Sequence, residues 1–129
     1  MQALILRVLV VDDIEIVRRG ICEILQTQAD IEIVCEAADG ADAVRKVREH
    51  RPDVVLLDVT MPVMNGFEAA RRIKHEFPSI LILVVSQSDS APFAREAIAA
   101  GASGYVMKSN ARTELIPMLR KTISQHVRT

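Results

Sequence analysis

Five side chains suited to metal or phosphoryl chemistry stand at the ends of four short apolar runs. Asp12 and Asp13 follow the first of these runs, and Asp58, Ser86 and Lys108 each follow one of the others. Three carboxylates brought close together repel one another unless a cation neutralises them. Carboxylate oxygens suit a hard ion, and Mg²⁺ favours sites where one or two carboxylates and phosphate oxygens supply part of its octahedron. The set therefore predicts a magnesium site.

The same residues can also carry a phosphoryl group. A carboxylate beside a metal ion can act as a nucleophile toward phosphorus and form an acyl phosphate. Such a transfer needs mainly positioning and charge neutralisation, which Lys108 would supply while the Ser86 hydroxyl held one phosphoryl oxygen. Taken singly, an Asp after a strand most often caps the next helix, and Lys108 is a solvated charge. The combination of the five favours phosphoryl chemistry.

Apolar runs alternate with segments of helical periodicity along the chain. We predict strands at residues 5–11, 31–37, 54–57, 80–85 and 105–107, and helices at residues 15–28, 41–50, 66–77, 90–101 and 112–126. The third and fourth strands hold no polar residue, which is typical of a parallel sheet covered by helices on both faces. The carboxyl ends of such strands form the edge where ligands bind. That edge gathers the five side chains, and only the second strand, which ends in Ala37-Ala38, adds no candidate.

Ser90 and Pro117 bear on where the fourth and the last helix begin. Ser90 is predicted to cap the fourth helix. Pro117 leaves two alternatives for the last helix. If that helix begins near Thr113, Pro117 lies close to its first turn, where a missing N–H costs little. If it begins at Ala111, a kink is expected.

Composition limits the function classes. The 129 residues are 50% apolar and carry a formal net charge of -1, so we expect one domain without the basic face of a DNA reader. The first seven residues lack the pattern of a signal peptide, and no apolar run approaches ~20 residues, so we expect a cytoplasmic protein without membrane association. Cys22 and Cys35 lack metal-ligand spacing and are predicted to be buried, reduced thiols. We assign to solvent the histidines and the paired basic residues of the helices: His50, His75, His126, Arg18-Arg19, Arg45-Lys46 and Arg71-Arg72.

Three segments resemble the receiver domains of bacterial two-component response regulators. They are residues 8–13 (VLVVDD), 52–66 (PDVVLLDVTMPVMNG) and 101–108 (GASGYVMK). Residues 17–21 (VRRGI) and 101–105 (GASGY) further resemble the NarL/FixJ, or LuxR-type, subgroup. The resemblance covers residues 1–129 and implies a flavodoxin-like three-layer α/β sandwich, with a parallel sheet of order 2-1-3-4-5 and five helices. Members of the subgroup usually carry a helix-turn-helix output domain after the receiver, so such a domain can follow residue 129.

The resemblance also implies roles for single residues. Asp58 would be the phosphoacceptor. Asp13, Asp58 and the backbone carbonyl of Thr60 would bind Mg²⁺ directly, with Asp12 acting largely through water. Three further residues would hold the phosphoryl group or act as the switch: Ser86, Lys108 and Tyr105.

The implied partners follow from the same resemblance. A sensor histidine kinase would phosphorylate the domain, and the face made by the fourth helix, fifth strand and fifth helix is a possible homodimer interface. DNA would be contacted only through the output domain. The chain would catalyse at most its own phosphorylation and dephosphorylation.

Four positions depart from the family pattern. Gln87 is larger than the residue common there and would narrow access to Asp58. Ser109 replaces a frequent proline, which leaves a cis peptide bond after Lys108 open. Ile14 replaces a polar residue, either making the site mouth more apolar or packing inward, and Thr60 occupies a position that tunes phosphoryl lifetime.

Two rival functions stay open. A phosphatase of the haloacid-dehalogenase type also uses an aspartyl nucleophile with Mg²⁺, but it carries a second Asp where this chain has Thr60. A pseudo-receiver is an interaction module that is never phosphorylated. The acidic cluster and Lys108 argue against that second rival, whereas Gln87 and Ile14 leave it open.

Overall fold

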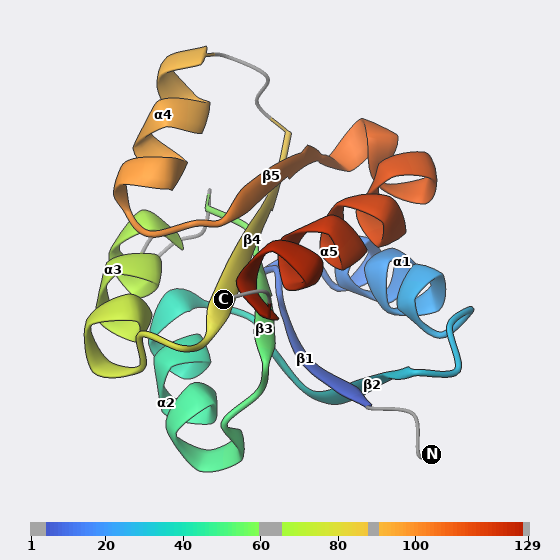
Figure 1. Cartoon of the computed structure of the whole chain (residues 1–129), viewed down its shortest axis with the longest axis horizontal. Coiled ribbons are helices and arrows are strands. Elements are labelled where there is room, and N and C mark those ends of the chain that lie inside the picture. The colour runs from blue at the N-terminus through green and yellow to red at the C-terminus, as the bar shows by residue number, and fades with distance from the viewer. Residues whose placement is uncertain (1–4, 60–65, 88–90, 128–129) are drawn as a thin grey trace.

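The fold is a parallel sheet between two layers of helices (Figure 1). The computed structural model describes residues 5–59, 66–87 and 91–127. The strands are β1 (Leu6–Val11), β2 (Ile31–Ala37), β3 (Val54–Leu57), β4 (Leu81–Ser86) and β5 (Gly104–Met107). The helices are α1 (Glu15–Leu25), α2 (Gly40–His50), α3 (Gly66–Glu76), α4 (Ala91–Ala99), the short 3₁₀ helix η1 (Lys108–Asn110) and α5 (Ala111–Val127). All neighbouring strands are parallel in the order β2-β1-β3-β4-β5, which confirms the predicted fold.

The central strands are buried on both faces, as their apolar sequences predict. Helices α2, α3 and α4 cover one face, and α1 and α5 cover the other (Figure 1). Val55 and Leu57 of β3 pack in the first layer, whereas Val54 and Leu56 pack in the second. This alternation follows from the two-residue period of a strand. The sheet therefore separates two apolar cores, and polar side chains gather at its carboxyl edge.

The edge strand β2 contains a bulge that changes the direction of its side chains. Val8 of β1 pairs with Ile33, but Leu9 pairs with Cys35, so Val34 is an extra residue. Ile33 consequently packs on the α1 and α5 side, whereas Cys35 packs on the α2 to α4 side. A bulge re-aims the side chains that follow it in this way.

The largest boundary difference is at the end of α1. The helix was predicted to reach Gln28 but ends at Leu25, and tighter turns follow. The N–H of Thr27 donates to the Ile24 oxygen at 3.2 Å, and the N–H of Gln28 donates to the Leu25 oxygen at 3.1 Å. The Thr27 hydroxyl also donates to the Ile24 oxygen at 2.7 Å. These three-residue hydrogen bonds tighten the last turn and end the helix.

The remaining helix and strand ends lie within one or two residues of prediction. Helix α5 begins at Ala111, directly after η1, so Pro117 lies inside the helix rather than in its first turn. The Lys108–Ser109 peptide bond is trans. Ser90, predicted to cap α4, lies outside the described residues.

The two cysteines are free thiols, and Cys22 is buried as predicted while Cys35 is only half-buried. Burial, followed by the negative charge of Glu36, raises the pKa of the Cys22 thiol to about 11. Burial also raises the pKa of Cys35. Both thiols therefore stay protonated at neutral pH.

We expect Cys22 to react slowly with iodoacetamide, because the thiolate is the reactive form. In a Cys35→Ala background at pH 8, its alkylation should be roughly 100-fold slower than that of a free cysteine derivative. Peptide mass spectrometry over a time course measures the rate. Alkylation as fast as the free compound would contradict the burial of this thiol.

A second prediction concerns two helical glycines with opposite surroundings. A Cβ on Gly66 would lie 2.3 Å from Val59 Cα and 2.4 Å from the Asp58 oxygen, whereas a Cβ on Gly20 meets nothing within 4 Å. We expect Gly66→Ala to lower the free energy of unfolding by about 1–3 kcal/mol through overpacking. Gly20→Ala should raise it by up to about 1 kcal/mol through helix propensity. Urea unfolding followed by circular dichroism measures both, and shifts in the same direction would refute the close approach at Gly66.

Candidate metal and phosphoryl site

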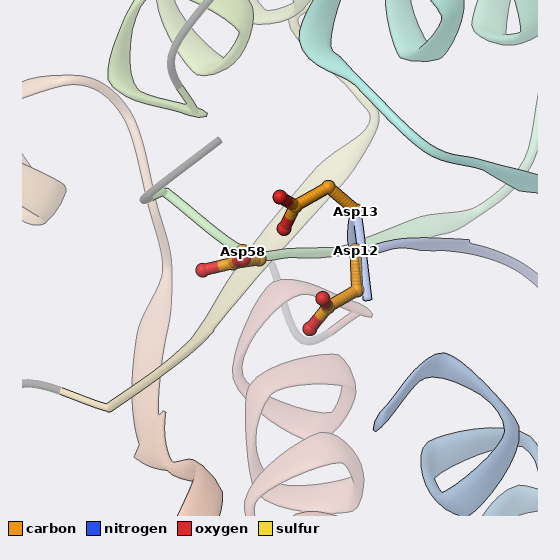
Figure 2. Close-up of side chains that lie close together, drawn as sticks. All are labelled: Asp12, Asp13 and Asp58. Carbon is orange, nitrogen blue, oxygen red and sulfur yellow. The ribbon is translucent and has the colours of Figure 1, made fainter. Parts of the chain in front are cut away.

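Three carboxylates meet at the carboxyl edge of the sheet, as the sequence predicted. Asp12 and Asp13 follow β1, and Asp58 follows the neighbouring strand β3. Figure 2 shows the three side chains converging, with Asp13 on one side of Asp58 and Asp12 on the other. One oxygen from each carboxylate lies within 4.8 Å of the others. Asp12 and Asp58 are 0% and 2% exposed, whereas Asp13 is exposed. The cluster is thus mostly buried but reaches solvent through Asp13.

Sheet hydrogen bonds position the cluster. The N–H of Asp58 donates to the Val11 oxygen at 3.0 Å, and the N–H of Asp12 donates to the Ala37 oxygen at 3.1 Å. These bonds continue the strand pairing one residue beyond β1 and β3. The backbone of both aspartates is therefore held by the rigid sheet rather than by a loop.

Lys108 brings a positive charge into the cluster. Its Nζ lies 2.8 Å from Asp12 Oδ2 and 3.4 Å from Asp58 Oδ2, and its side chain is only 11% exposed. Lys108 follows β5, which is two strands away from β3. Its long side chain spans the end of β4, where Ser86 is the last residue. The predicted meeting of Asp12, Asp13, Asp58 and Lys108 is confirmed.

The composition of the cluster fits a hard divalent cation. Three carboxylates face one ammonium group, so two negative charges remain to be neutralised when all are ionised. The available ligands are oxygens, which Mg²⁺ prefers. In addition, the buried Oδ2 of Asp12 has the Lys108 ammonium at 2.8 Å as its ion-pair partner but accepts no well-directed hydrogen bond from the described residues. Asp13, Asp58 and Asp12 are the described residues that would hold such an ion.

Asp12 also organises the turn that leads into α1. Its Oδ1 accepts the N–H of Ile14 at 2.9 Å. Ile14 is the N-cap residue of α1, and its side chain makes no capping hydrogen bond. One carboxylate oxygen of Asp12 thus shapes the backbone while the other faces Lys108. Ile14 is 42% exposed, so its side chain does not pack in the core.

The other predicted site residues occupy β4 and β5. Ser86 is fully buried at the end of β4, and the next residue, Gln87, is exposed. Tyr105 is half-buried in β5, and its ring meets Phe93 of α4 edge-on, with ring centres 6.4 Å apart. Phe93 meets Phe67 of α3 at 5.1 Å. Thr60 lies outside the described residues.

Sequence reasoning was wrong about Arg18, which was assigned to solvent. Its side chain is 18% exposed. Its Nη1 donates to the backbone oxygen of Asp12 at 2.7 Å, and its Nε donates to Glu36 Oε1 at 2.9 Å. Arg19 fits the prediction, because its side chain is 75% exposed and forms an ion pair with the exposed Glu15 at 3.1 Å. Helical spacing places Arg18 one turn after Ile14 and so beside the acidic turn, which was the signal available in the sequence.

Lys46 is a second correction among the basic pairs. Its side chain is 27% exposed, and its Nζ donates to the backbone oxygen of Glu36. It also lies 3.3 Å from Asp42. Lys46 therefore fastens α2 to the end of β2 instead of facing water alone.

Comparison with known proteins identifies the class. The response regulator receiver domain family matches residues 8–120. The oxygen regulatory protein NreC of Staphylococcus epidermidis is 38% identical over 116 residues, which cover 89% of this chain and 53% of the relative. A LuxR family two-component response regulator from Aurantimonas sp. superimposes with a TM-score of 0.90 at 36% identity, covering 94% of this chain and 86% of the other. The signal receiver domain of the putative response regulator NarL from Mycobacterium tuberculosis superimposes with a TM-score of 0.85 at 33% identity. The match covers 92% of this chain and 96% of the other.

The fold and the acidic edge are thus those of a receiver-type signalling domain. The chain belongs to the response regulator receiver domain family, on the LuxR and NarL side of it. It spans about half the length of the curated relatives it matches. Among the described residues, no helix is long and apolar enough to cross a membrane.

We expect Lys108→Met to destabilise the protein in the presence of a chelator, because two buried carboxylates lose their ammonium partner. Removing one member of a buried ion pair costs about 3–5 kcal/mol. Adding Asp12→Asn should restore part of the loss, since one buried charge then disappears while the acceptor for Ile14 remains. Urea unfolding in EDTA measures each variant. Lys121→Met, at an exposed position of α5, is the control, and equal unfolding midpoints for it and Lys108→Met would contradict the pairing.

Proposed function

We propose that this domain is a phosphorylation-activated switch whose phosphoacceptor is Asp58. A sensor histidine kinase or a small acyl phosphate would be the donor. The observation that carries the proposal is the largely buried cluster of Asp12, Asp13 and Asp58, with the Lys108 ammonium beside Asp12 and Asp58. Asp13, Asp58 and the carbonyl of Thr60 would hold Mg²⁺ directly, and Asp12 would act largely through water. Bound there, the metal would neutralise the crowded carboxylates and the incoming phosphoryl oxygens.

The chain's own residues supply the nucleophile and part of the charge. A carboxylate oxygen of Asp58 forms a bond to phosphorus, and the bond from phosphorus to the donor's leaving group breaks, with its electron pair leaving on that group. Lys108, 3.4 Å from Asp58 in the unphosphorylated protein, would pair with a phosphoryl oxygen. Ser86 would donate its hydroxyl to another. Gln87 is exposed beside Ser86 and would control access to Asp58.

The conformational relay would run through β4 and β5. Movement of Ser86 toward the phosphoryl group would open space that the ring of Tyr105 enters. That ring packs edge-on against Phe93, so α4 would respond to the same movement. The face formed by α4, β5 and α5 would change shape and present a homodimer interface. This is a local charge biasing an element with two arrangements.

In the full-length protein, we propose that the receiver controls transcription. The curated relatives are about twice as long as the match, and several are named as transcriptional regulators. A helix-turn-helix domain after residue 129 would contact DNA, whereas the receiver itself, with its net charge of -1, would not. We assign the protein to the cytoplasm and assign it no turnover of outside substrates.

A pseudo-receiver is the second candidate. Ile14 and Gln87 favour it, because both depart from the family pattern, both are exposed, and each directly follows a site residue, Asp13 and Ser86 respectively. A phosphatase of the haloacid-dehalogenase type loses support, because the chain belongs to the receiver family. The experiment below separates these candidates.

We expect incubation with acetyl phosphate to add one phosphoryl group to the parent chain only when Mg²⁺ is present. Asp58→Asn should take none, because the amide is a poor nucleophile. Asp53→Asn is the matched control, because Asp53 is an exposed carboxylate before β3 that accepts the N–H of Arg7. Intact mass spectrometry with and without hydroxylamine, which cleaves acyl phosphates, measures the adduct. No adduct on the parent chain would favour the pseudo-receiver, and steady release of phosphate from a small ester would revive the phosphatase.

A further inference from the structure

We propose that Arg18 is a positioning residue that holds the Asp12–Asp13 turn in the arrangement needed to bind Mg²⁺. This inference rests on the proposed function, because it assigns a role within the same site. Arg18 is not itself placed among the residues that touch the metal or the phosphoryl group. It acts through the backbone of the acidic turn.

The acidic turn is held from two sides. Within the turn, Asp12 Oδ1 accepts the N–H of Ile14 at 2.9 Å. From α1, Arg18 Nη1 donates to the Asp12 backbone oxygen at 2.7 Å. That oxygen belongs to the peptide unit that joins Asp12 to Asp13. Fixing its direction therefore fixes the plane from which the Asp13 side chain departs toward Asp58.

The other end of Arg18 is anchored on β2. Its Nε donates to Glu36 Oε1 at 2.9 Å. Glu36 pairs with Val10 only because of the extra residue Val34, and Val10 packs in the core beneath α1. Without the bulge, Cys35 would lie opposite Val10 and Glu36 would point to the α2 side. The bulge thus aims Glu36 at Arg18.

The backbone at the end of β2, which carries Glu36, is itself held by hydrogen bonds. Lys46 of α2 donates to the Glu36 backbone oxygen, and the next residue, Ala37, accepts the N–H of Asp12 at 3.1 Å. A closed circuit of hydrogen bonds therefore runs from Asp12 through Arg18 to the end of β2 and back to Asp12. Partners of this kind, which orient the direct ligands of a metal, strongly affect its affinity.

Because Arg18 is positively charged, the direction in which its removal changes the Mg²⁺ affinity distinguishes a positioning role from a purely electrostatic one. If Arg18 influenced the site by charge alone, it would repel Mg²⁺, and its removal would strengthen metal binding. If Arg18 positions the turn, its removal weakens metal binding although a positive charge is lost. Pairing with Glu36 at 2.9 Å offsets the repulsion in the native protein. The two roles therefore predict opposite changes in affinity.

The test titrates Mg²⁺ alone into ¹⁵N-labelled protein and follows the amide signals of Asp13 and Asp58. We expect Arg18→Met to weaken Mg²⁺ binding on the order of 10-fold. Arg18→Lys should recover part of the affinity, because the ammonium keeps the charge and the donors but lacks the fixed fork of the guanidinium that joins Asp12 to Glu36. Glu36→Gln should also weaken binding, since the ion pair that anchors Arg18 becomes a weaker neutral hydrogen bond and the neutralising charge is lost. Arg19→Met, a change of the same kind one residue along α1, should stay within about 2-fold of the parent, because its partner is an exposed ion pair.

A second readout separates positioning from general damage. The rate of phosphorylation by acetyl phosphate is measured against Mg²⁺ concentration. For Arg18→Met we expect the half-saturating Mg²⁺ concentration to rise while the rate at saturation changes much less. A merely structural defect would lower the rate at saturating Mg²⁺ without raising the half-saturating Mg²⁺ concentration.

Several outcomes would overturn the inference. It fails if Arg18→Met binds Mg²⁺ as tightly as Arg19→Met or more tightly. If Arg18→Met does not fold, affinities of Arg18→Lys and Glu36→Gln equal to that of Arg19→Met overturn it as well. If the parent chain binds Mg²⁺ but takes no phosphoryl group, the proposed function is wrong. In that case a Mg²⁺ affinity that still falls in Arg18→Met would support the positioning role. A parent chain that binds no Mg²⁺ overturns both.

Discussion

The crowding of Asp12, Asp13 and Asp58, with one ammonium group beside the two buried carboxylates, is the interaction on which the rest of the structure depends. Two of the carboxylates are buried, and a buried charge costs several kcal/mol unless it is paired. Lys108 supplies that pairing from the end of β5, two strands away from β3, and this depends on the strand order β3-β4-β5.

The stability needed to keep such a cluster comes from elsewhere in the molecule. The two apolar layers on either side of β3 and β4 bury a large hydrophobic surface, while the cluster itself opposes folding through desolvation and repulsion. The two are connected by backbone hydrogen bonds, because Asp58 and Asp12 extend the strand pairing past its apolar part. The rigid sheet consequently resists the separation that electrostatic repulsion alone would favour.

The sequence predicted the sheet and most of the site, because both depend on local patterns. All-apolar strands and single polar residues at their ends were enough to bring Asp12, Asp13, Asp58 and Lys108 together. The circuit through Arg18 could not be predicted in the same way. Residues 33, 34 and 35 are all apolar, so the pattern of this strand does not say which of them is the extra residue, yet the bulge at Val34 sends Ile33 and Cys35 to opposite faces. A bulge depends on how two strands meet, and the alternation of one strand does not record it.

Lys108 also explains why metal and phosphoryl group would support each other at this site. In the unphosphorylated protein its ammonium lies closer to Asp12 than to Asp58, at 2.8 Å against 3.4 Å. A phosphoryl group on Asp58 carries more negative charge than the carboxylate it replaces, and would therefore draw the ammonium away from Asp12. Asp12 would then be a buried carboxylate in need of another cation. Phosphorylation would in this way increase the demand for Mg²⁺ at the cluster, and by reciprocity bound Mg²⁺ would favour the phosphorylated state.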